Sequence, residues 1–413
     1  MRALAARALL DGGAPEAYRY LKMEGQRYRA EHNVVQQPTR AVPVTPLPRE
    51  ECLHIAQLAP PWIPVPPPGY GGIEFMLALL CDALVARGHE VELFCAPGSR
   101  SSAKVTPLLE APHPESIERA LFEADHVSQA FGHVDSAAEA GTPFDVVHDH
   151  SGYTALSIAD RLGTPLVHTV HGPFDQDTKP YYSRHASKGS IVCISHSQAS
   201  FAPERTEVAG VVHNPIDVNS WPVGYQKEDW LLWLGRIVPE KGPQRAIRVA
   251  RATGRPLVLA GNVQPRHERF FADEIQPHID GRMIRYVGEV GGARKQQLFA
   301  NAYAFLMPIR WPEPFGLVMV ESLAAGTPVL AFAQGAAPEI VEHGRNGFLV
   351  ENEEEMAAMV EKAGEIDPAE CRRSAERFSP DRVAAGYESV YQRARETAVE
   401  VPGELRRTGS PVA

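Results

Sequence analysis

Hydrophobic and polar positions along the 413-residue chain follow two alternating rhythms from residue 52 onward. Short apolar runs of strand length are each followed by a longer segment in which apolar residues recur every three or four positions. The segment 72–87 is the clearest of these longer segments, and its spacing predicts a helix that ends before Gly88. Because strands that alternate with helices form a parallel sheet covered on both faces, the pattern predicts an α/β fold.

The same rhythm occurs twice along the chain. In the first half, strands are expected at 52–58, 91–96, 144–150, 165–171, 190–195 and 210–214, and helices at 72–87, 116–130 and 152–162. In the second half, strands are expected at 230–235, 256–261, 283–288, 302–309 and 328–332, and helices at 240–253, 293–301, 315–325, 336–343 and 380–399. Residues 214–228 interrupt the pattern with proline and glycine, and a domain boundary is expected there.

Chain length also favours two domains, because a single hydrophobic core stops growing near ~250–300 residues. The expected architecture is two Rossmann-like, doubly wound parallel-sheet domains that face each other across a cleft. Their expected bounds are 51–222 and 223–379, followed by the helix at about 380–399 and a tail at 400–413. Residues 1–50 are expected to form an extension with a short helix at 14–30 and a proline-rich linker. This extension is either loosely ordered or an arm that binds a partner or a membrane surface.

Composition and charge exclude several classes of protein. The formal net charge of −10 argues against nucleic-acid binding, which usually requires a basic surface. The five cysteines show neither metal-binding nor disulfide spacing, which indicates a reducing compartment. No apolar run approaches the ~18 residues of a membrane span, and the N-terminus does not read as a secretory signal. A cytoplasmic protein is expected, with peripheral contact at the inner face of the membrane left open.

Two basic residues follow the first strand of the second half. Arg236 comes directly after this strand, and Lys241 stands at the start of the next helix. Because the carboxyl ends of parallel strands meet the ligand in such folds, both side chains are expected to converge on one anion, most naturally a diphosphate. The alternative for such a pair, taken alone, is two solvated surface charges.

Two carboxylates stand in the otherwise apolar stretch PEPFGLVMVE at 312–321. Glu313 is expected in the loop after a strand, and Glu321 inside the helix that follows. At its start, this helix offers free backbone amides to an anion, at Gly316, Leu317 and Val318. A carboxylate at Glu321 can accept two hydrogen bonds from a vicinal diol. The spacing therefore suits a nucleotide sugar, with the ribose at Glu321, the diphosphate at the amides and the sugar at Glu313.

These motifs resemble those of the retaining glycosyltransferases of family four, which have the GT-B fold. The E-x7-E signature of that family matches Glu313 and Glu321, and its G-R-x4-K-G signature matches 235–242. Further similar stretches are AAGTPVLAF at 324–332, GAAPEIVEHGRNGFLV at 335–350 and YGGIE at 70–74, so the resemblance covers about 51–350. It implies an acceptor domain at 51–222, a donor domain at 223–379, and a final helix that packs back on the acceptor domain.

The resemblance also implies roles for individual residues. His150 would contact the donor sugar and His171 would lie on the acceptor side. The residues expected to carry catalysis are His150, Glu313, Arg236 and Lys241. The residues expected to bind the donor are Gly71, Gly72, Arg236, Lys241, Val290, Gly292, Lys295, Glu313, Phe315, Gly316, Leu317, Val318 and Glu321.

The strand-end sequence FDVVHDH adds a histidine pair to the first half. Strand alternation places His148 and His150 on one face of the sheet and Asp149 on the other. Two histidines at this spacing can bind a metal, but no third ligand is evident nearby. The alternative for each histidine, His171 included, is a core residue whose hydrogen bonds are satisfied within the protein.

The expected reaction is transfer of a hexose-type sugar from a nucleotide-diphosphate sugar to an acceptor hydroxyl with retention of configuration. No metal or other cofactor is expected, because Arg236 and Lys241 can stabilise the leaving diphosphate electrostatically. A uridine donor is slightly ahead of a guanosine donor. The acceptor belongs to an unspecified glycan, glycolipid or natural product, and the protein is expected to be a monomer or homodimer. The alternatives are a nucleotide-sugar epimerase on the same fold and a non-catalytic nucleotide-sugar binding protein.

Overall fold

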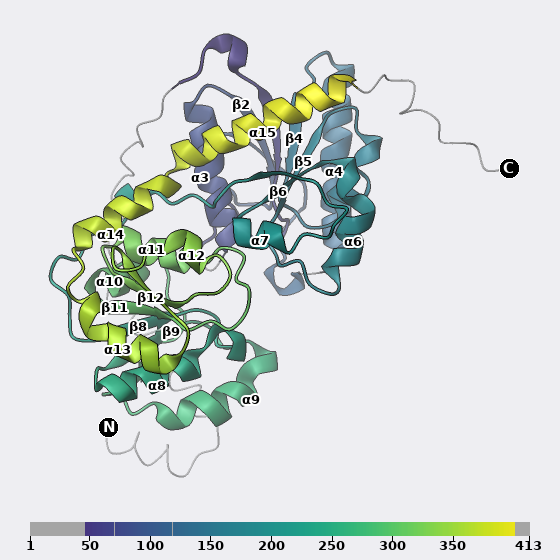
Figure 1. Ribbon diagram of the computed structural model, residues 1–413. Coiled ribbons are helices and arrows are strands. Elements are labelled where there is room, and N and C mark those ends of the chain that lie inside the picture. The colour runs from purple at the N-terminus through teal and green to yellow at the C-terminus, as the bar shows by residue number, and fades with distance from the viewer. Residues whose placement is uncertain (1–45, 70, 118, 401–413) are drawn as a thin grey trace. The chain divides into compact units, whose positions relative to one another are not determined.

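The computed structural model describes residues 46–69, 71–117 and 119–400, which fall into two compact units (Figure 1). The N-terminal unit consists of residues 46–217 together with 377–400, and the C-terminal unit consists of residues 218–376. The helix expected at 14–30 lies outside the described residues. The tail expected at 400–413 also lies outside them, except for residue 400.

Within the described residues, the N-terminal unit has a seven-stranded parallel sheet in the order β3-β2-β1-β4-β5-β6-β7. Its strands are β1 (His54–Leu58), β2 (Glu90–Cys95), β3 (Lys104–Pro107), β4 (Val146–Asp149), β5 (Leu166–Val170), β6 (Ser190–Cys193) and β7 (Val208–Val211). Its helices are α3 (Gly72–Ala86), α4 (Ala120–Glu139), α5 (Thr154–Ser157), α6 (Thr178–His185), α7 (His196–Ser200) and α15 (Pro380–Glu400). Both faces of the sheet are covered, because Ile55 of β1 joins a core with α3 and α15 whereas Ala56 joins a core with α4 and α5.

The C-terminal unit repeats this layout with a six-stranded parallel sheet in the order β10-β9-β8-β11-β12-β13 among the described residues. Its strands are β8 (Leu231–Leu234), β9 (Leu257–Ala260), β10 (Ile284–Tyr286), β11 (Ala304–Met307), β12 (Val329–Phe332) and β13 (Gly347–Val350). Its helices are α8 (Pro243–Thr253), α9 (Glu268–Phe270), α10 (Gly292–Asn301), α11 (Leu317–Ala324), α12 (Ala337–Ile340), α13 (Glu353–Ala363) and α14 (Pro368–Ala375). The expected doubly wound parallel-sheet class is therefore confirmed for each unit.

Helix α15 packs on the N-terminal unit, beside α3 (Figure 1). Its buried side chains, Val383, Tyr387 and Tyr391 among them, join the core formed by β1 and α3. Arg87, at the end of α3, forms ion pairs with Asp381 and Glu388 of α15. The last described helix is thus an integral layer of the N-terminal unit.

Several expected element bounds were wrong. Helix α4 begins at Ala120 rather than near 116, because a 3₁₀ turn at Pro114–Ser116 precedes it, and it continues to Glu139. The segment expected as a helix at 152–162 contains only the short helix α5 and a 3₁₀ turn at Ala159–Arg161, and the segment expected as a helix at 336–343 contains only the single turn α12. Strand β3 was not predicted, since it is a short edge strand with no buried residue. Strand β13 and helices α6, α13 and α14 were also missed.

In each sheet the strand order reverses at one place, between β1 and β4 in the N-terminal unit and between β8 and β11 in the C-terminal unit. The loops that leave neighbouring strands at such a switch point diverge to opposite faces and leave room for a ligand at the carboxyl edge. Several residues singled out from the sequence follow these strands: Gly71, Gly72, His150, Arg236, Lys241 and Glu313. His171 follows β5 instead, and Val290, Gly292 and Lys295 follow β10. No helix within the described part of the chain is long and apolar enough to cross a membrane.

Candidate functional site

The switch point of the C-terminal unit brings Lys241 and Glu313 together. Lys241 follows β8 and Glu313 follows β11, and these two strands are neighbours. The Lys241 ammonium forms an ion pair with Oε2 of Glu313, and the indole N–H of Trp311 donates to the same oxygen at 2.7 Å. The ammonium also lies 5.1 Å from the centroid of the Trp311 ring. Trp311 was missed in the sequence, where nothing distinguished it from any other loop tryptophan.

A buried arginine that the sequence analysis also missed fixes the loop that carries Lys241. Arg245, in the first turns of α8, donates from Nε to the carbonyl of Pro308 at 2.6 Å. Its Nη2 donates to the carbonyls of Pro239 and Glu240, at 3.0 and 2.8 Å. Gly242 allows this close approach, since a Cβ there would lie 2.4 Å from the Pro308 carbonyl oxygen. The loops after β8 and β11 are thereby tied to one another through Arg245.

Arg236 lies half-buried after β8. Its guanidinium has no hydrogen-bond or ion-pair partner among the described residues, so its donors are available to a ligand. The structure pairs Lys241 with Glu313. The expected convergence of Arg236 and Lys241 on one anion stays a prediction.

Glu321 is held on one side only. Its Oε1 accepts a hydrogen bond from Lys295 of α10, whereas its Oε2 is buried and has no hydrogen-bond partner in the described part of the chain. An unpaired buried carboxylate oxygen is costly, which makes this atom a place for a ligand hydroxyl. Lys295, expected near the nucleobase, is therefore bound directly to the residue expected near the ribose. Val290 and Gly292 lie just before it, and Gly292 is exposed with φ +51° in the left-handed region.

The start of α11 lies between Glu313 and Glu321. Gly316 caps the helix with φ +88°, and Phe315 beside it is buried. The amides of Leu317 and Val318 make no backbone hydrogen bond among the described residues, so they are open at the positive end of the helix dipole. The half-buried side chains of these two residues lie within the same turn.

Gly335, in the loop after β12, packs against the backbone of Glu313. A Cβ at Gly335 would lie 2.4 Å from the Glu313 nitrogen and 2.5 Å from its oxygen. The amide of the next residue, Ala336, donates to the Glu313 carbonyl at 3.0 Å. The loops that follow three neighbouring strands of the sheet, β8, β11 and β12, thus hold Glu313 in place.

In the N-terminal unit, Gly71 and Gly72 stand at the start of α3, after β1. A Cβ at Gly71 would lie 2.8 Å from Oε2 of Glu74, so the carboxylate sits directly against the glycine backbone. Glu74 is only 5% exposed, and burial raises its pKa from 4.5 to about 7. In the sequence, Glu74 stood out only as part of a motif, and its burial as an ionisable group was not predicted.

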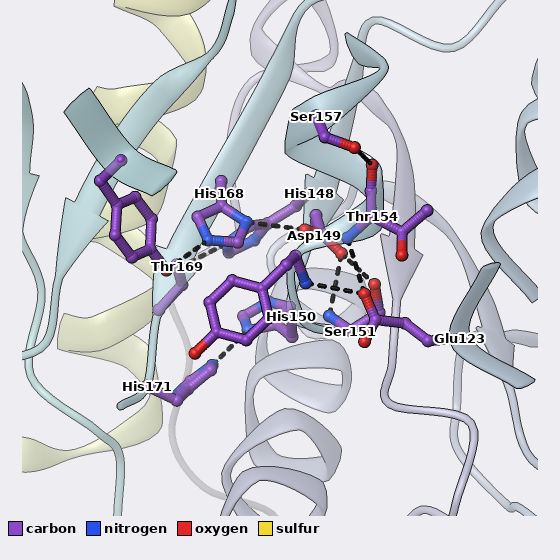
Figure 2. A network of polar contacts seen from close by, with 12 residues as sticks. Glu123, His148, Asp149, His150, Ser151, Thr154, Ser157, His168, Thr169 and His171 are labelled. Atoms are coloured by element: carbon purple, nitrogen blue, oxygen red, sulfur yellow. Dashed lines mark hydrogen bonds and ion pairs between the residues drawn. The ribbon is translucent and has the colours of Figure 1, made fainter. Parts of the chain in front are cut away.

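The carboxyl edge of the same sheet carries the expected histidines (Figure 2). As alternation predicted, His148 and His150 share one face, with ring centroids 4.0 Å apart. Asp149 faces the other way, where it accepts hydrogen bonds from His168 Nδ1 at 2.7 Å and from the Ser151 hydroxyl at 2.6 Å. His148 is bonded to Tyr391 at 2.7 Å and to Thr169 at 2.8 Å. For His148, the alternative of a satisfied core histidine is confirmed.

His150 is also fully engaged within the protein. Its Nδ1 is 2.9 Å from Nε2 of His171, and its Nε2 is 3.2 Å from Oε1 of Gln57. In this conformation neither nitrogen is free to contact a sugar, and the side chain that is partly exposed is His171. Burial lowers the pKa of His171 to about 3 and that of His150 well below its ordinary value, so both rings are neutral near pH 7. Among the described residues, no group of three or more His, Cys, Asp or Glu side chains is arranged to hold a metal ion.

Two family models match the chain. The model for Glycosyltransferase Family 4 matches residues 70–220, and the model for glycosyl transferases group 1 matches residues 221–378. A D-inositol 3-phosphate glycosyltransferase from Streptomyces avermitilis is 28% identical over 405 residues, covering 82% of this chain and 87% of the relative. A glycogen synthase from Mycobacterium tuberculosis is 29% identical over 333 residues, covering 68% of this chain and 79% of the relative.

A solved structure is similar over most of its length. AviGT4, a glycosyltransferase involved in avilamycin A biosynthesis, is 28% identical and superimposes with a TM-score of 0.63. The match covers 83% of this chain and 98% of AviGT4. Each Rossmann-like unit is thus matched by its own glycosyltransferase model, and the chain belongs to the GT-B glycosyltransferases.

Proposed function

We propose that the protein is a retaining glycosyltransferase that moves a hexose-type sugar from a nucleotide-diphosphate sugar to an acceptor hydroxyl. The observation that carries this proposal is the buried, unpartnered Oε2 of Glu321, eight residues after a loop carboxylate. A ribose hydroxyl would donate to this oxygen, and a uridine donor is slightly favoured over a guanosine donor. The pairing of Oε1 with Lys295 fixes the carboxylate so that Oε2 stays turned toward the ligand.

The diphosphate would lie between this carboxylate and Glu313. The unpaired guanidinium of Arg236 and the open amides of Leu317 and Val318 supply donors for the phosphate oxygens. Lys241 would move from Glu313 toward the phosphate, which frees Oε2 of Glu313 for the sugar hydroxyls. Trp311 would keep Glu313 in position during this exchange, because its indole bond at 2.7 Å does not depend on Lys241.

In the proposed reaction, the bond between the anomeric carbon and the diphosphate breaks, and the acceptor oxygen bonds to that carbon on the same face. The acceptor proton passes to the leaving phosphate oxygen. Arg236, Lys241 and the helix amides stabilise the charge that develops on the diphosphate, so we propose that the step needs no metal or other cofactor. His150 and His171 belong to the N-terminal unit, where His171, the more exposed of the pair, would offer an atom to a sugar hydroxyl and His150 would act through its hydrogen bond to His171.

The relatives support a hydroxyl acceptor without identifying it. One is named for D-inositol 3-phosphate and another for glycogen, two different kinds of polyol. We therefore propose a glycan, glycolipid or natural-product acceptor. The epimerase and binding-protein alternatives are not favoured, because both family models describe glycosyl transfer.

The test is a thermal-shift titration of the full chain with UDP, GDP and ADP and with their hexose conjugates. A ligand at ~100 times its Kd should stabilise the protein by roughly 2.7 kcal/mol. Glu321→Gln keeps the size of the side chain and should weaken the shift, whereas Glu274→Gln, at an exposed position of the same unit, should not. No shift with any nucleotide would refute the proposed donor site. NMR of the product formed with the stabilising donor then reports whether the anomeric configuration is retained.

A further inference from the structure

A chain of hydrogen bonds passes through the buried polar side chains at the carboxyl edge of the N-terminal sheet. It starts at Tyr391 of α15, whose hydroxyl is 3.0 Å from Nε2 of Gln57. Oε1 of Gln57 is 3.2 Å from Nε2 of His150, and Nδ1 of His150 is 2.9 Å from Nε2 of His171. Gln57 is completely buried, one residue before the end of strand β1, and nothing in the proposed reaction uses it. Figure 2 shows the His150–His171 end of this chain.

The chemistry of these groups determines which one donates and which one accepts in each hydrogen bond. An amide oxygen can only accept, so the bond to Oε1 of Gln57 requires the proton of His150 to be on Nε2. A neutral His150 then has an unprotonated Nδ1, which can only accept from His171. His171 must therefore carry its own proton on Nε2. This leaves a lone pair on Nδ1 of His171, an atom with no partner among the described residues.

We propose that Gln57, held by Tyr391, is a positioning residue that sets the tautomer of His150 and His171, so that His171 presents a hydrogen-bond acceptor to the ligand. The ligand group that such an atom recognises is a hydroxyl, which fits a sugar or a polyol acceptor; this part rests on the proposed function. The low pKa of His171, about 3 because of burial, keeps the ring neutral and its lone pair available.

The hydrogen bonds of Tyr391, His148 and Thr169 are consistent with the same assignment of donors and acceptors. With Gln57 donating to its hydroxyl, Tyr391 has its own proton left for Nδ1 of His148, 2.7 Å away. His148 then donates from Nε2 to Thr169 at 2.8 Å. The opposite orientation of the Gln57 amide would exchange every donor and acceptor, and His171 would then present an N–H. The orientation of the Gln57 amide therefore decides whether Nδ1 of His171 accepts a hydrogen bond from the ligand or donates one to it.

Long-range ¹H–¹⁵N correlation spectra of the histidine-labelled full chain test this inference directly. Signals of His150 and His171 are assigned with His150→Gln and His171→Gln, and both rings should show a protonated Nε2 and an unprotonated Nδ1. Gln57→Glu should preserve this pattern, because a carboxylate also only accepts. Gln57→Leu should shift both rings toward a mixture of tautomers, while Gln129→Leu, at an exposed position of α4, should change nothing.

Activity gives the second readout. With the donor that stabilises the protein, Gln57→Leu should lower kcat/KM by about tenfold, the loss expected for one hydrogen bond, and Gln57→Glu should restore most of it. A protonated Nδ1 on wild-type His171, or tautomers that do not change in Gln57→Leu, would overturn the inference. If Gln57→Leu does not fold, the wild-type and Gln57→Glu spectra decide alone. Since the spectra need no donor, failure of the proposed function would show separately, as absence of any nucleotide-dependent stabilisation.

Discussion

Replacing Gly335 with alanine should damage the site through the backbone of Glu313. The added methyl group would lie 2.4 Å from the Glu313 nitrogen, whereas unstrained carbon contacts need ~3.5 Å, so this backbone must move by about 1 Å. Overpacking of this kind typically costs about 1–3 kcal/mol. The left-handed conformation, with φ +58°, adds about 1–2 kcal/mol for any residue with a Cβ.

Gly344→Ala separates the two contributions. Gly344 has φ +80° in the same unit, but a Cβ there meets nothing within 4 Å, so its substitution carries only the conformational cost. We expect Gly344→Ala to lower the free energy of unfolding by about 1–2 kcal/mol, and Gly335→Ala by about 1–3 kcal/mol more. A displacement of about 1 Å at Glu313 should also reduce kcat/KM of Gly335→Ala by roughly 100-fold.

Urea unfolding followed by tryptophan fluorescence is the suitable assay. Four of the five tryptophans belong to the C-terminal unit and therefore report on the substituted region: Trp221, Trp230, Trp233 and Trp311. Equal destabilisation in the two variants would mean that the loop after β12 moves without displacing Glu313. Gly335 would then be shown not to position this carboxylate.

Three further predictions address other contacts. Trp311→Phe keeps an aromatic ring beside Lys241 but removes the indole donor to Glu313. Steady-state kinetics should therefore show kcat/KM lowered by about tenfold, while the unfolding transition stays unchanged. Arg245→Met removes three hydrogen bonds and leaves the Pro308 carbonyl without a donor among the described residues, and it should lower the free energy of unfolding by about 2–4 kcal/mol in urea titrations. Glu74, whose pKa is raised to about 7, binds its proton more tightly when folded, so stability should fall as pH rises from about 4.5 to 7 and then level off. Glu74→Gln should remove that slope and stabilise the protein by up to ~3 kcal/mol at pH 8, and an unchanged slope between pH 5 and 8 would contradict this assignment.

Hydrophobic periodicity was sufficient to predict the class of the fold. Helix α3 and the strands on either side of it were predicted to within two residues, because a 3.6-residue apolar period and short continuous apolar runs both reflect burial directly. Strand β3 could not be predicted, since it contributes no buried residue and holds its place only by pairing with β2. The length of α4 was underestimated, although the buried positions Phe131 and Val134 continue its stripe.

The residue types of the proposed donor site were predictable, but their partners were not. Glu321 and Lys295 were both expected near the nucleotide, yet their ion pair depends on how α10 packs against α11. Trp311 and Arg245 carry no motif and act only through the loops that they join. The bond between Gln57 and Tyr391 joins residues 334 positions apart, and only the packing of α15 against the sheet creates it.

The return of α15 to the N-terminal sheet has a consequence for biosynthesis. On the ribosome, residues 46–217 emerge long before Val383, Tyr387 and Tyr391, which complete one face of their hydrophobic core. Until then, apolar side chains of α3 and β1 are exposed to solvent, whereas the contiguous C-terminal unit can fold as soon as it has been synthesised. A nonsense codon just before residue 377 would therefore harm the half of the protein that is translated first.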